Sequence, residues 1–193
     1  MANNFSNIDN FFDDVNSIVS NKNTASVSKS NFNPNDIIEK AKKLNIKIHP
    51  LDIEQVVKQV FGISIIEEKF DKNVSGFIEN INGKWLIYLN KYESVFRKRF
   101  TIAHELAHFI KHKDNYLFGS VFPDKVFFRD SVNNSIEREA NDFAAELLMP
   151  KDVFIKEIED GCNTIEKLAD KFQLSTSAVR YRAYKLGLIP EYD

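Results

Sequence analysis

A His-Glu-x-x-His motif formed by His104, Glu105 and His108 constrains this sequence more than any other feature. On an α-helix, residues four apart lie about 40° from each other around the axis, so the two histidines project from one face. At that separation two imidazoles can share one tetrahedral zinc ion. Glu105 lies at the rim of the same face, where it can take a proton from water without being a ligand, as a general base does.

The residues around the motif predict a buried helix from about Glu93 to Lys111. They are nearly all apolar beside the histidines, and neither Gly nor Pro interrupts the chain between Tyr92 and Asp114. A pair of core histidines with hydrogen-bonded ring nitrogens is the alternative interpretation. His112 follows one turn later. As a third ligand from the same helix it would crowd the metal, so we expect it to pack beside the ligands and support them.

A catalytic zinc needs a third protein ligand and one open position. Residues 135–149 predict a second helix, and one stripe of it contains Glu137, Ala140, Asn141, Ala144 and Leu148. The alanines allow close helix–helix approach, so Glu137 can reach the metal and Asn141 can hydrogen-bond a ligand. Alternatively, Glu137 could form a capping box with Asn134 at the start of this helix and bind no metal. Glu139 points to a different face, where we expect it to be solvated.

Two stretches together resemble the ImmA/IrrE family of zinc metallopeptidases. They are Phe-Thr-Ile-Ala-His-Glu-Leu-Ala-His at 100–108 and Ile-Glu-Arg-Glu-Ala-Asn-Asp-Phe-Ala-Ala-Glu-Leu-Leu-Met-Pro at 136–150. The resemblance implies a gluzincin-like site in which His104, His108 and Glu137 hold Zn²⁺ and Glu105 is the base. It also implies a substrate class: helix-turn-helix transcriptional repressors, whose cleavage releases stress-response or mobile-element genes. Ala107 departs from the family pattern, in which Gly is common, but removes no catalytic group.

Composition sets the broad class. With 193 residues, 43% of them hydrophobic and 17 of them Phe, the chain can bury one core of moderate size. A net charge of −2 gives no general attraction to nucleic acid or to an anionic membrane. The single Cys162 excludes an intramolecular disulfide, which fits a reducing compartment. No segment reads as a signal peptide or a membrane span, so we expect a cytoplasmic protein without a membrane partner.

The predicted fold is α+β: a small antiparallel sheet packed against the zinc-binding helical core, with a C-terminal helix-turn-helix-like segment. The expected strands are 63–68, 74–80 and 84–90, and Asn82-Gly83 between the last two is a strong hairpin signal. Both faces of the third strand carry apolar groups, so helices should cover one of them. Two helices should precede the sheet, at 35–44 and from Pro50 to Phe61, with His49 in the loop between them.

We expect three segments: an N-terminal part at 1–34, the metallopeptidase core at 35–160 and a C-terminal part at 161–193. The first holds an amphipathic helix at 5–19 and a polar linker at 20–35. Within the core, 113–134 forms a long hydrophobic connection in which 126–129 could be a short strand lining the cleft. A sheet edge beside such a cleft commonly takes an extended peptide as an extra strand.

The C-terminal segment leaves other functions open. Residues 164–186 read as a helix, a tight turn capped by Ser175 or Thr176, and a second helix; its polar residues Arg180, Arg182, Tyr184 and Lys185 could lie on a DNA-recognition helix. Direct DNA binding is not favoured, because a DNA-binding protein usually shows a basic face. The alternative functions are a DNA-binding regulator that uses the metal core as sensor or scaffold, and a protein-interaction module of a toxin–antitoxin or phage locus.

Three consecutive cations, Arg97, Lys98 and Arg99, lie near the start of the motif helix. Cations there oppose the helix macrodipole and need another reason to be present. We expect them to be solvated on an exposed face, or to bind a substrate or partner.

Overall fold

The computed structural model describes residues 32–112 and 131–190, with only the backbone for 131–134. The predicted N-terminal helix at 5–19, most of the polar linker, and the predicted strand at 126–129 lie outside the described residues. Within them the α+β class is confirmed.

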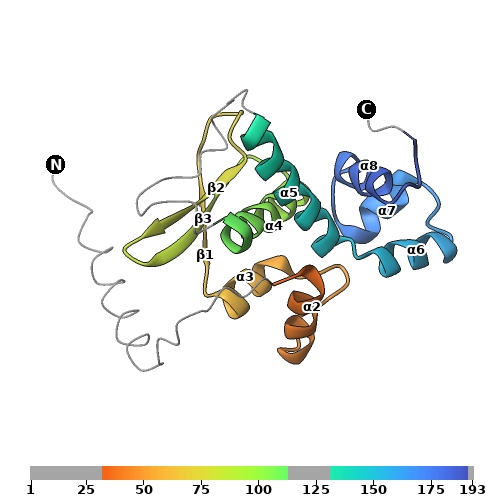
Figure 1. Ribbon diagram of the computed structural model, residues 1–193, viewed down its shortest axis with the longest axis horizontal. Coiled ribbons are helices and arrows are strands. Elements are labelled where there is room, and N and C mark those ends of the chain that lie inside the picture. Colours follow the sequence, from red (N-terminus) through yellow and green to blue (C-terminus); the bar gives the residue numbers. More distant parts are fainter. Residues whose placement is uncertain (1–31, 113–130, 191–193) are drawn as a thin grey trace. The chain divides into compact units, whose positions relative to one another are not determined.

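The elements follow one another as α2 (Pro34–Lys43), α3 (Ile53–Phe61), β1 (Ser64–Glu68), β2 (Gly76–Ile81), β3 (Lys84–Asn90), α4 (Val95–His112), α5 (Ser131–Leu148), α6 (Lys151–Glu159), α7 (Ile165–Phe172) and α8 (Thr176–Lys185) (Figure 1).

 Helix α6 ends at Glu159 with Asp160 as its C-cap, directly before Gly161, where we predicted the start of the C-terminal segment.

Capping residues account for where the first helices begin and end. Asn33 forms a capping box with Asp36 at the start of α2. The second helix begins at Ile53 and not at Pro50, because the side chain of Asp52 accepts a hydrogen bond from the backbone N–H of Gln55 and so caps α3. Gly62 ends α3 in the left-handed conformation that glycine adopts without strain.

The sheet has the strand order β1-β3-β2. β2 and β3 form the antiparallel hairpin that Asn82-Gly83 predicts, and both residues have the positive φ, 51° and 83°, that a two-residue turn of this kind requires. β1 pairs with β3 in parallel, however, so the sheet is mixed, and the expectation of a wholly antiparallel sheet is wrong for this strand. A turn signal determines the pairing within one hairpin only, and β1 reaches β3 through no such turn.

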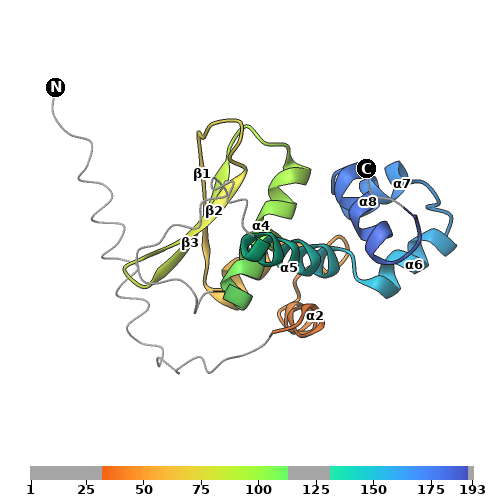
Figure 2. The same cartoon turned by 45° about the horizontal axis from the view of Figure 1, so that its top comes forward.

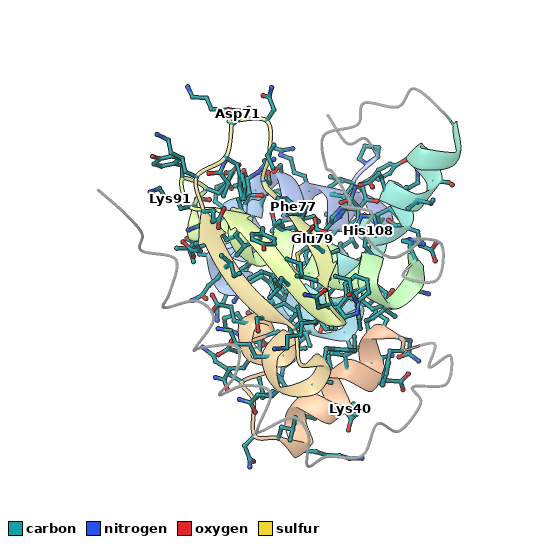
Figure 3. The ribbon with its side chains drawn as sticks, turned by 90° about the vertical axis from the view of Figure 1, so that its left-hand side faces the viewer. Lys40, Asp71, Phe77, Glu79, Lys91 and His108 are labelled. Atoms are coloured by element: carbon teal, nitrogen blue, oxygen red, sulfur yellow. The ribbon has the colours of Figure 1, made fainter. Side chains whose placement is uncertain are left out.

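Helix α4 covers one face of the sheet, as expected from the apolar residues of β3. Ile78, Ile87 and Leu89 are at most 1% exposed beneath it. On the opposite face Phe77 stacks on Tyr88, with ring centroids 4.8 Å apart, and Figure 3 views the sheet from this side. One face of the sheet therefore packs against α4, and the opposite face carries the aromatic pair Phe77 and Tyr88.

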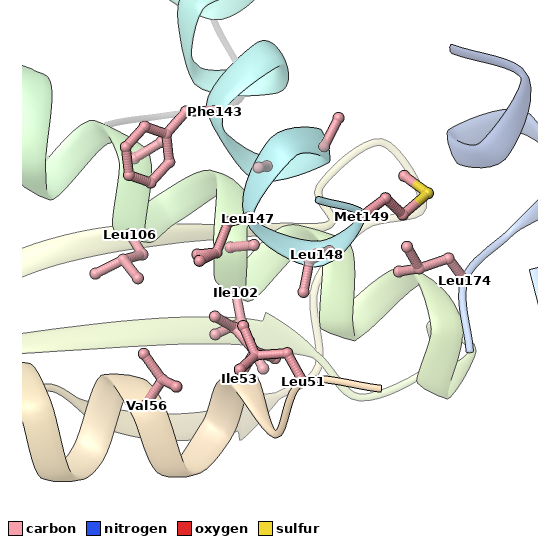
Figure 4. Packing of buried hydrophobic residues seen from close by; sticks show 14 of the residues in the cluster. Leu51, Ile53, Val56, Ile102, Leu106, Phe143, Leu147, Leu148, Met149 and Leu174 are labelled. Carbon is pink, nitrogen blue, oxygen red and sulfur yellow. The ribbon is translucent and has the colours of Figure 1, made fainter. Parts of the chain in front are cut away.

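Helix α4 lies between the sheet and α5 (Figures 1 and 2). Leu106 and Ala107 of α4, and Ala140, Ala144 and Leu147 of α5, are fully buried. The small alanines let the two helices approach closely, as the stripe on α5 predicts. Figure 4 shows how this cluster continues into α3 through Ile53 and Val56. The shared core fixes the position of α5 relative to the histidines of α4.

The C-terminal helices α7 and α8 form the predicted helix–turn–helix unit. Ser175 caps α8 by accepting a hydrogen bond from the backbone N–H of Ala178. α8 contacts α5: the Tyr181 hydroxyl donates to Asp142 Oδ1 at 2.5 Å, and Lys185 Nζ lies 2.8 Å from Asp142 Oδ2. Arg182, 8% exposed, donates from Nε to the Met149 carbonyl at 2.9 Å.

Candidate metal centre

Helix α4 brings two imidazoles together. His104 and His108 are 8% and 3% exposed, and their ring centroids lie 4.6 Å apart. Their Nε2 atoms are separated by 3.0 Å. Residues four apart on a helix face the same side, so this convergence follows from the local spacing.

Helix α5 adds a carboxylate to the pair. Glu137 Oε2 lies 3.2 Å from His104 Nε2, and Glu137 Oε1 lies 3.3 Å from His108 Nε2. The capping-box alternative for Glu137 is wrong, because α5 begins at Ser131 and Glu137 lies well inside it. The carboxylate reaches the histidines across the close α4–α5 contact.

The three residues fit a metal ion. Their ligand atoms all lie within 4.8 Å of one another. Metal–nitrogen and metal–oxygen bonds of about 2.0–2.2 Å place two tetrahedral ligands about 3.3–3.6 Å apart. The observed separations of 3.0, 3.2 and 3.3 Å lie at or just below that range. The Glu137 side chain is 49% exposed, so the cluster is accessible from one side.

The histidines also favour the ionised form of the carboxylate. Burial opposes the charge on Glu137, but hydrogen bonds from the side chains of His104 and His108 outweigh it and hold the pKa of Glu137 well below its usual range. An ionised carboxylate is the form that binds a cation.

Two further predicted residues lie directly behind the cluster. Asn141 Oδ1 lies 3.0 Å from His104 Nδ1, so the ring N–H donates to the amide and Nε2 is left facing Glu137. His112 is 4% exposed, and its ring centroid lies 5.4 Å from that of His108. Burial, and then the neighbouring His108, lower the pKa of His112. A neutral imidazole packs against the pair without adding charge.

Glu105 is more enclosed than its predicted place at the rim of the helix face. It is 2% exposed, because the sheet and α5 pack against opposite sides of α4. Glu139 is 53% exposed, as expected, and lies 3.6 Å from Lys111 Nζ and 3.9 Å from His112 Nε2. The structure therefore separates the two nearby carboxylates of α5: Glu137 meets the histidine pair, and Glu139 stays at the surface.

A cavity of about 370 Å³ opens beside the cluster. The residues that line it are Ser75, Arg97, Phe100, Thr101, His104, Glu137, Asn141, Ser175, Ser177, Ala178 and Tyr181. Four of these belong to α8 or its cap. The sequence suggested that part of the hydrophobic connection at 113–134 could line the cleft, but its residues up to 130 lie outside the described residues. The contribution of α8 was not predicted. Nothing local in the α8 sequence signals that it reaches α5.

Of the three cations at the start of α4, Arg97 is 62% exposed, as expected, whereas Lys98 and Arg99 are partly buried and bind partners within the protein, which corrects the expectation for these two. Lys98 Nζ lies 2.7 Å from Glu67 Oε2. Arg97 Nε lies 3.0 Å from Ser75 Oγ and 3.3 Å from a carboxylate oxygen of Glu93.

Arg99 connects three parts of the chain. Its Nη2 donates to the Leu51 carbonyl at 2.9 Å, and its Nε donates to the Gln173 carbonyl at 3.1 Å. It thus ties α4 to the start of α3 and to the turn before α8. These contacts offset the unfavourable position of a cation near a helix N-terminus.

Comparison with known proteins gives a family match. The model of the IrrE N-terminal-like domain, Peptidase_M78, matches residues 58–184, a span that contains the whole histidine–glutamate cluster, all of α7, and α8 up to Tyr184. No curated protein matches the chain.

Among solved structures, a Mycobacterium tuberculosis transcriptional regulator is similar, with a TM-score of 0.57 and 16% sequence identity. The match covers 77% of this chain but 45% of the regulator, so this chain corresponds to less than half of that protein. At this identity the similarity is one of fold. Among the described residues, no helix combines the length and apolar character needed to cross a membrane.

Proposed function

This chain belongs to the Peptidase_M78 family of IrrE N-terminal-like domains, and from that premise we propose that it is a zinc-dependent endopeptidase that hydrolyses a peptide bond in a protein substrate. The observation that carries the proposal is the convergence of His104, His108 and Glu137 from two helices, with separations between ligand atoms of 3.0 to 3.3 Å.

In this proposal His104, His108 and Glu137 hold the ion. When bound, zinc supplies a Lewis acid that polarises a carbonyl and makes water more acidic. Asn141 holds the His104 ring with Nε2 toward the site, and His112 packs behind His108. The half-exposed side of Glu137 leaves room for the peptide to approach.

Glu105 acts as the general base. It accepts a proton from the attacking water while the water oxygen bonds to the scissile carbonyl carbon. It then returns that proton to the amide nitrogen as the carbon–nitrogen bond breaks, so the products are an amine and a carboxylic acid, which then ionises. Its position next to His104 in the motif supports this role.

The substrate we propose is a helix-turn-helix transcriptional repressor, whose cleavage would release stress-response or mobile-element genes. The resemblance of 100–108 and 136–150 to the ImmA/IrrE family supports it. Such a substrate is cytoplasmic, and we expect the enzyme to act there. The alternative of a DNA-binding regulator is weakened by α8, since Arg182 and Lys185 are directed to Met149 and Asp142 of the same chain.

The test is to load the purified protein with zinc and mix it with the repressor encoded beside its own gene. Fragments are identified by mass spectrometry for the wild type, Glu105→Gln and Glu139→Gln. Wild type and Glu139→Gln should cleave one bond, and Glu105→Gln should not. The mechanism is wrong if the wild type holds no metal, or if Glu105→Gln cleaves as well as wild type.

A further inference from the structure

The N-terminal part of α8 forms one wall of the cavity beside the metal cluster. Ser177, Ala178 and Tyr181 line the same space of about 370 Å³ as His104 and Glu137. This helix, for which DNA recognition was a possible role that we did not favour, therefore lies where a substrate of the neighbouring cluster would bind.

This wall is held in place from both ends. At the start of α8, Arg99 of α4 donates to the carbonyl of Gln173, just before the capping Ser175, at 3.1 Å. Further along, Tyr181 and Lys185 both bond to Asp142 of α5, at 2.5 and 2.8 Å. The anchors connect α8 to the two helices that carry the cluster, so the cavity has a defined width.

The lining is partly apolar and has little uncompensated charge away from the cluster. Phe100, Ala178 and the Tyr181 ring supply apolar surface, and the hydroxyl groups of the other lining residues supply hydrogen bonds. Arg97, the one cation among the described residues of the lining, lies 3.3 Å from Glu93. A volume of about 370 Å³ is near the lower end of the range for small-ligand sites, enough for one large side chain with its flanking backbone.

We propose that α8 selects the substrate: Ser177, Ala178 and Tyr181 bind an apolar side chain of the peptide next to the scissile bond. The proposal rests on the proposed function and deepens it, since it assigns the helix–turn–helix unit to peptide recognition. It also explains why the basic side chains Arg182 and Lys185 are used for anchoring.

The probes for the test are leucine hydroxamate and glycine hydroxamate, which share a zinc-binding group and differ in the apolar side chain. Binding to the zinc-loaded full chain is measured by calorimetry. The test variants are Ser177→Val and Ser177→Phe, which fill the cavity in two steps. The control is Thr176→Phe, because Thr176 is exposed on the same turn of α8 and does not line the cavity. Ser177 is exposed too, so both positions tolerate a larger side chain.

Wild type and Thr176→Phe should bind leucine hydroxamate about tenfold more tightly than glycine hydroxamate, a ratio typical of one apolar side chain in a pocket. Ser177→Val should reduce that ratio and Ser177→Phe should abolish it, with glycine hydroxamate binding unchanged. Zinc content is measured on every sample first, so that a failure of the proposed zinc site can be told apart from a failure of the proposed role of α8.

If the wild type holds no zinc, the proposed function fails and this inference fails with it. If zinc is present but the ratio is the same in all four proteins, only the role of α8 is overturned. A third outcome would assign α8 to nucleic-acid binding instead. In that case the ratio of the two hydroxamate affinities is unchanged, the wild type binds a specific DNA duplex tightly, and Ser177→Phe and Arg180→Ala abolish that binding.

Discussion

The Nδ1 atom of His104 lies 3.0 Å from the Oδ1 atom of Asn141, across the contact between α4 and α5. An amide oxygen can only accept, so the imidazole carries a proton on Nδ1 and its Nε2 faces Glu137, where it can give up its own proton and bind a metal ion. One hydrogen bond therefore sets both the orientation and the tautomer of a proposed zinc ligand.

Replacing Asn141 should weaken zinc binding without touching a ligand. Asn141→Leu removes the acceptor and should lower zinc affinity by about 10–100-fold, the usual cost of losing a residue that orients a ligand. Asn141→Asp keeps an acceptor and should stay close to the wild type. Competition with a chromophoric chelator measures both. Equal zinc affinities for Asn141→Leu and wild type would show that this hydrogen bond is not needed to orient His104 for zinc binding.

The two carboxylates of α5 should differ sharply. Glu137→Gln should lower zinc affinity by more than the about 10–100-fold expected for a supporting residue, because it replaces a charged ligand. Glu139→Gln should leave the affinity unchanged, since Glu139 is 53% exposed and lies beside Lys111. The same chelator competition applies. The reverse order would transfer the ligand role to Glu139.

At Gly76 in β2 the neighbouring atoms leave no room for a side chain. A Cβ atom there would lie 2.4 Å from the Tyr88 carbonyl oxygen and 2.7 Å from Thr101 Cγ2. Gly76→Ala should therefore lower the free energy of unfolding by about 1–3 kcal/mol, as overpacking does. Urea denaturation measures this value.

The control is the double variant Gly76→Ala/Thr101→Ser. Because Thr101→Ser removes Cγ2, the double variant should recover part of the stability that Gly76→Ala loses, while the close contact with the Tyr88 carbonyl oxygen remains. A Gly76→Ala protein as stable as the wild type would mean that β2 moves away from α4 at little cost.

His49 is a loop residue, as predicted, but its Nε2 lies 2.8 Å from Glu157 Oε1 on α6. This hydrogen bond is the main reason why the pKa of Glu157 is lowered in the folded protein. A lowered pKa stabilises the fold above the unfolded value of about 4.3, and the contribution is lost as pH falls through the folded pKa.

Glu157→Gln should therefore be less stable than the wild type by about 1 kcal/mol at pH 7. The difference should begin to shrink as the pH falls below about 4.3, the unfolded pKa, and should be lost once the pH is below the lowered folded pKa of Glu157. Urea denaturation across this pH range measures it. A difference independent of pH would mean that shape, and not the charge of Glu157, accounts for the effect.

Much of the fold and cluster follows from local patterns. Helical spacing places His104 and His108 on one face, the alanine stripe explains how Glu137 reaches them, and Asn82-Gly83 determines the hairpin. These features depend on residues a few positions apart, so the sequence alone predicts them.

The parts that sequence reasoning missed are contacts between distant segments. The parallel pairing of β1, the bonds of Arg99 to two backbone carbonyls and the reach of α8 to the cavity join residues far apart in the chain. Backbone carbonyls exist at every position, so no residue pattern singles out Leu51 or Gln173 as partners. Glu105 was placed at a rim for the same reason: its enclosure depends on what packs around α4.

Anomalous diffraction at the zinc absorption edge, from crystals of the zinc-loaded protein, locates the ion directly. The expected result is one peak between His104 Nε2, His108 Nε2 and a Glu137 oxygen, with bonds of about 2.0–2.2 Å. A peak at His112 and Glu139 instead, or no peak at the three residues in protein saturated with zinc, would contradict the assignment of this cluster as the metal centre.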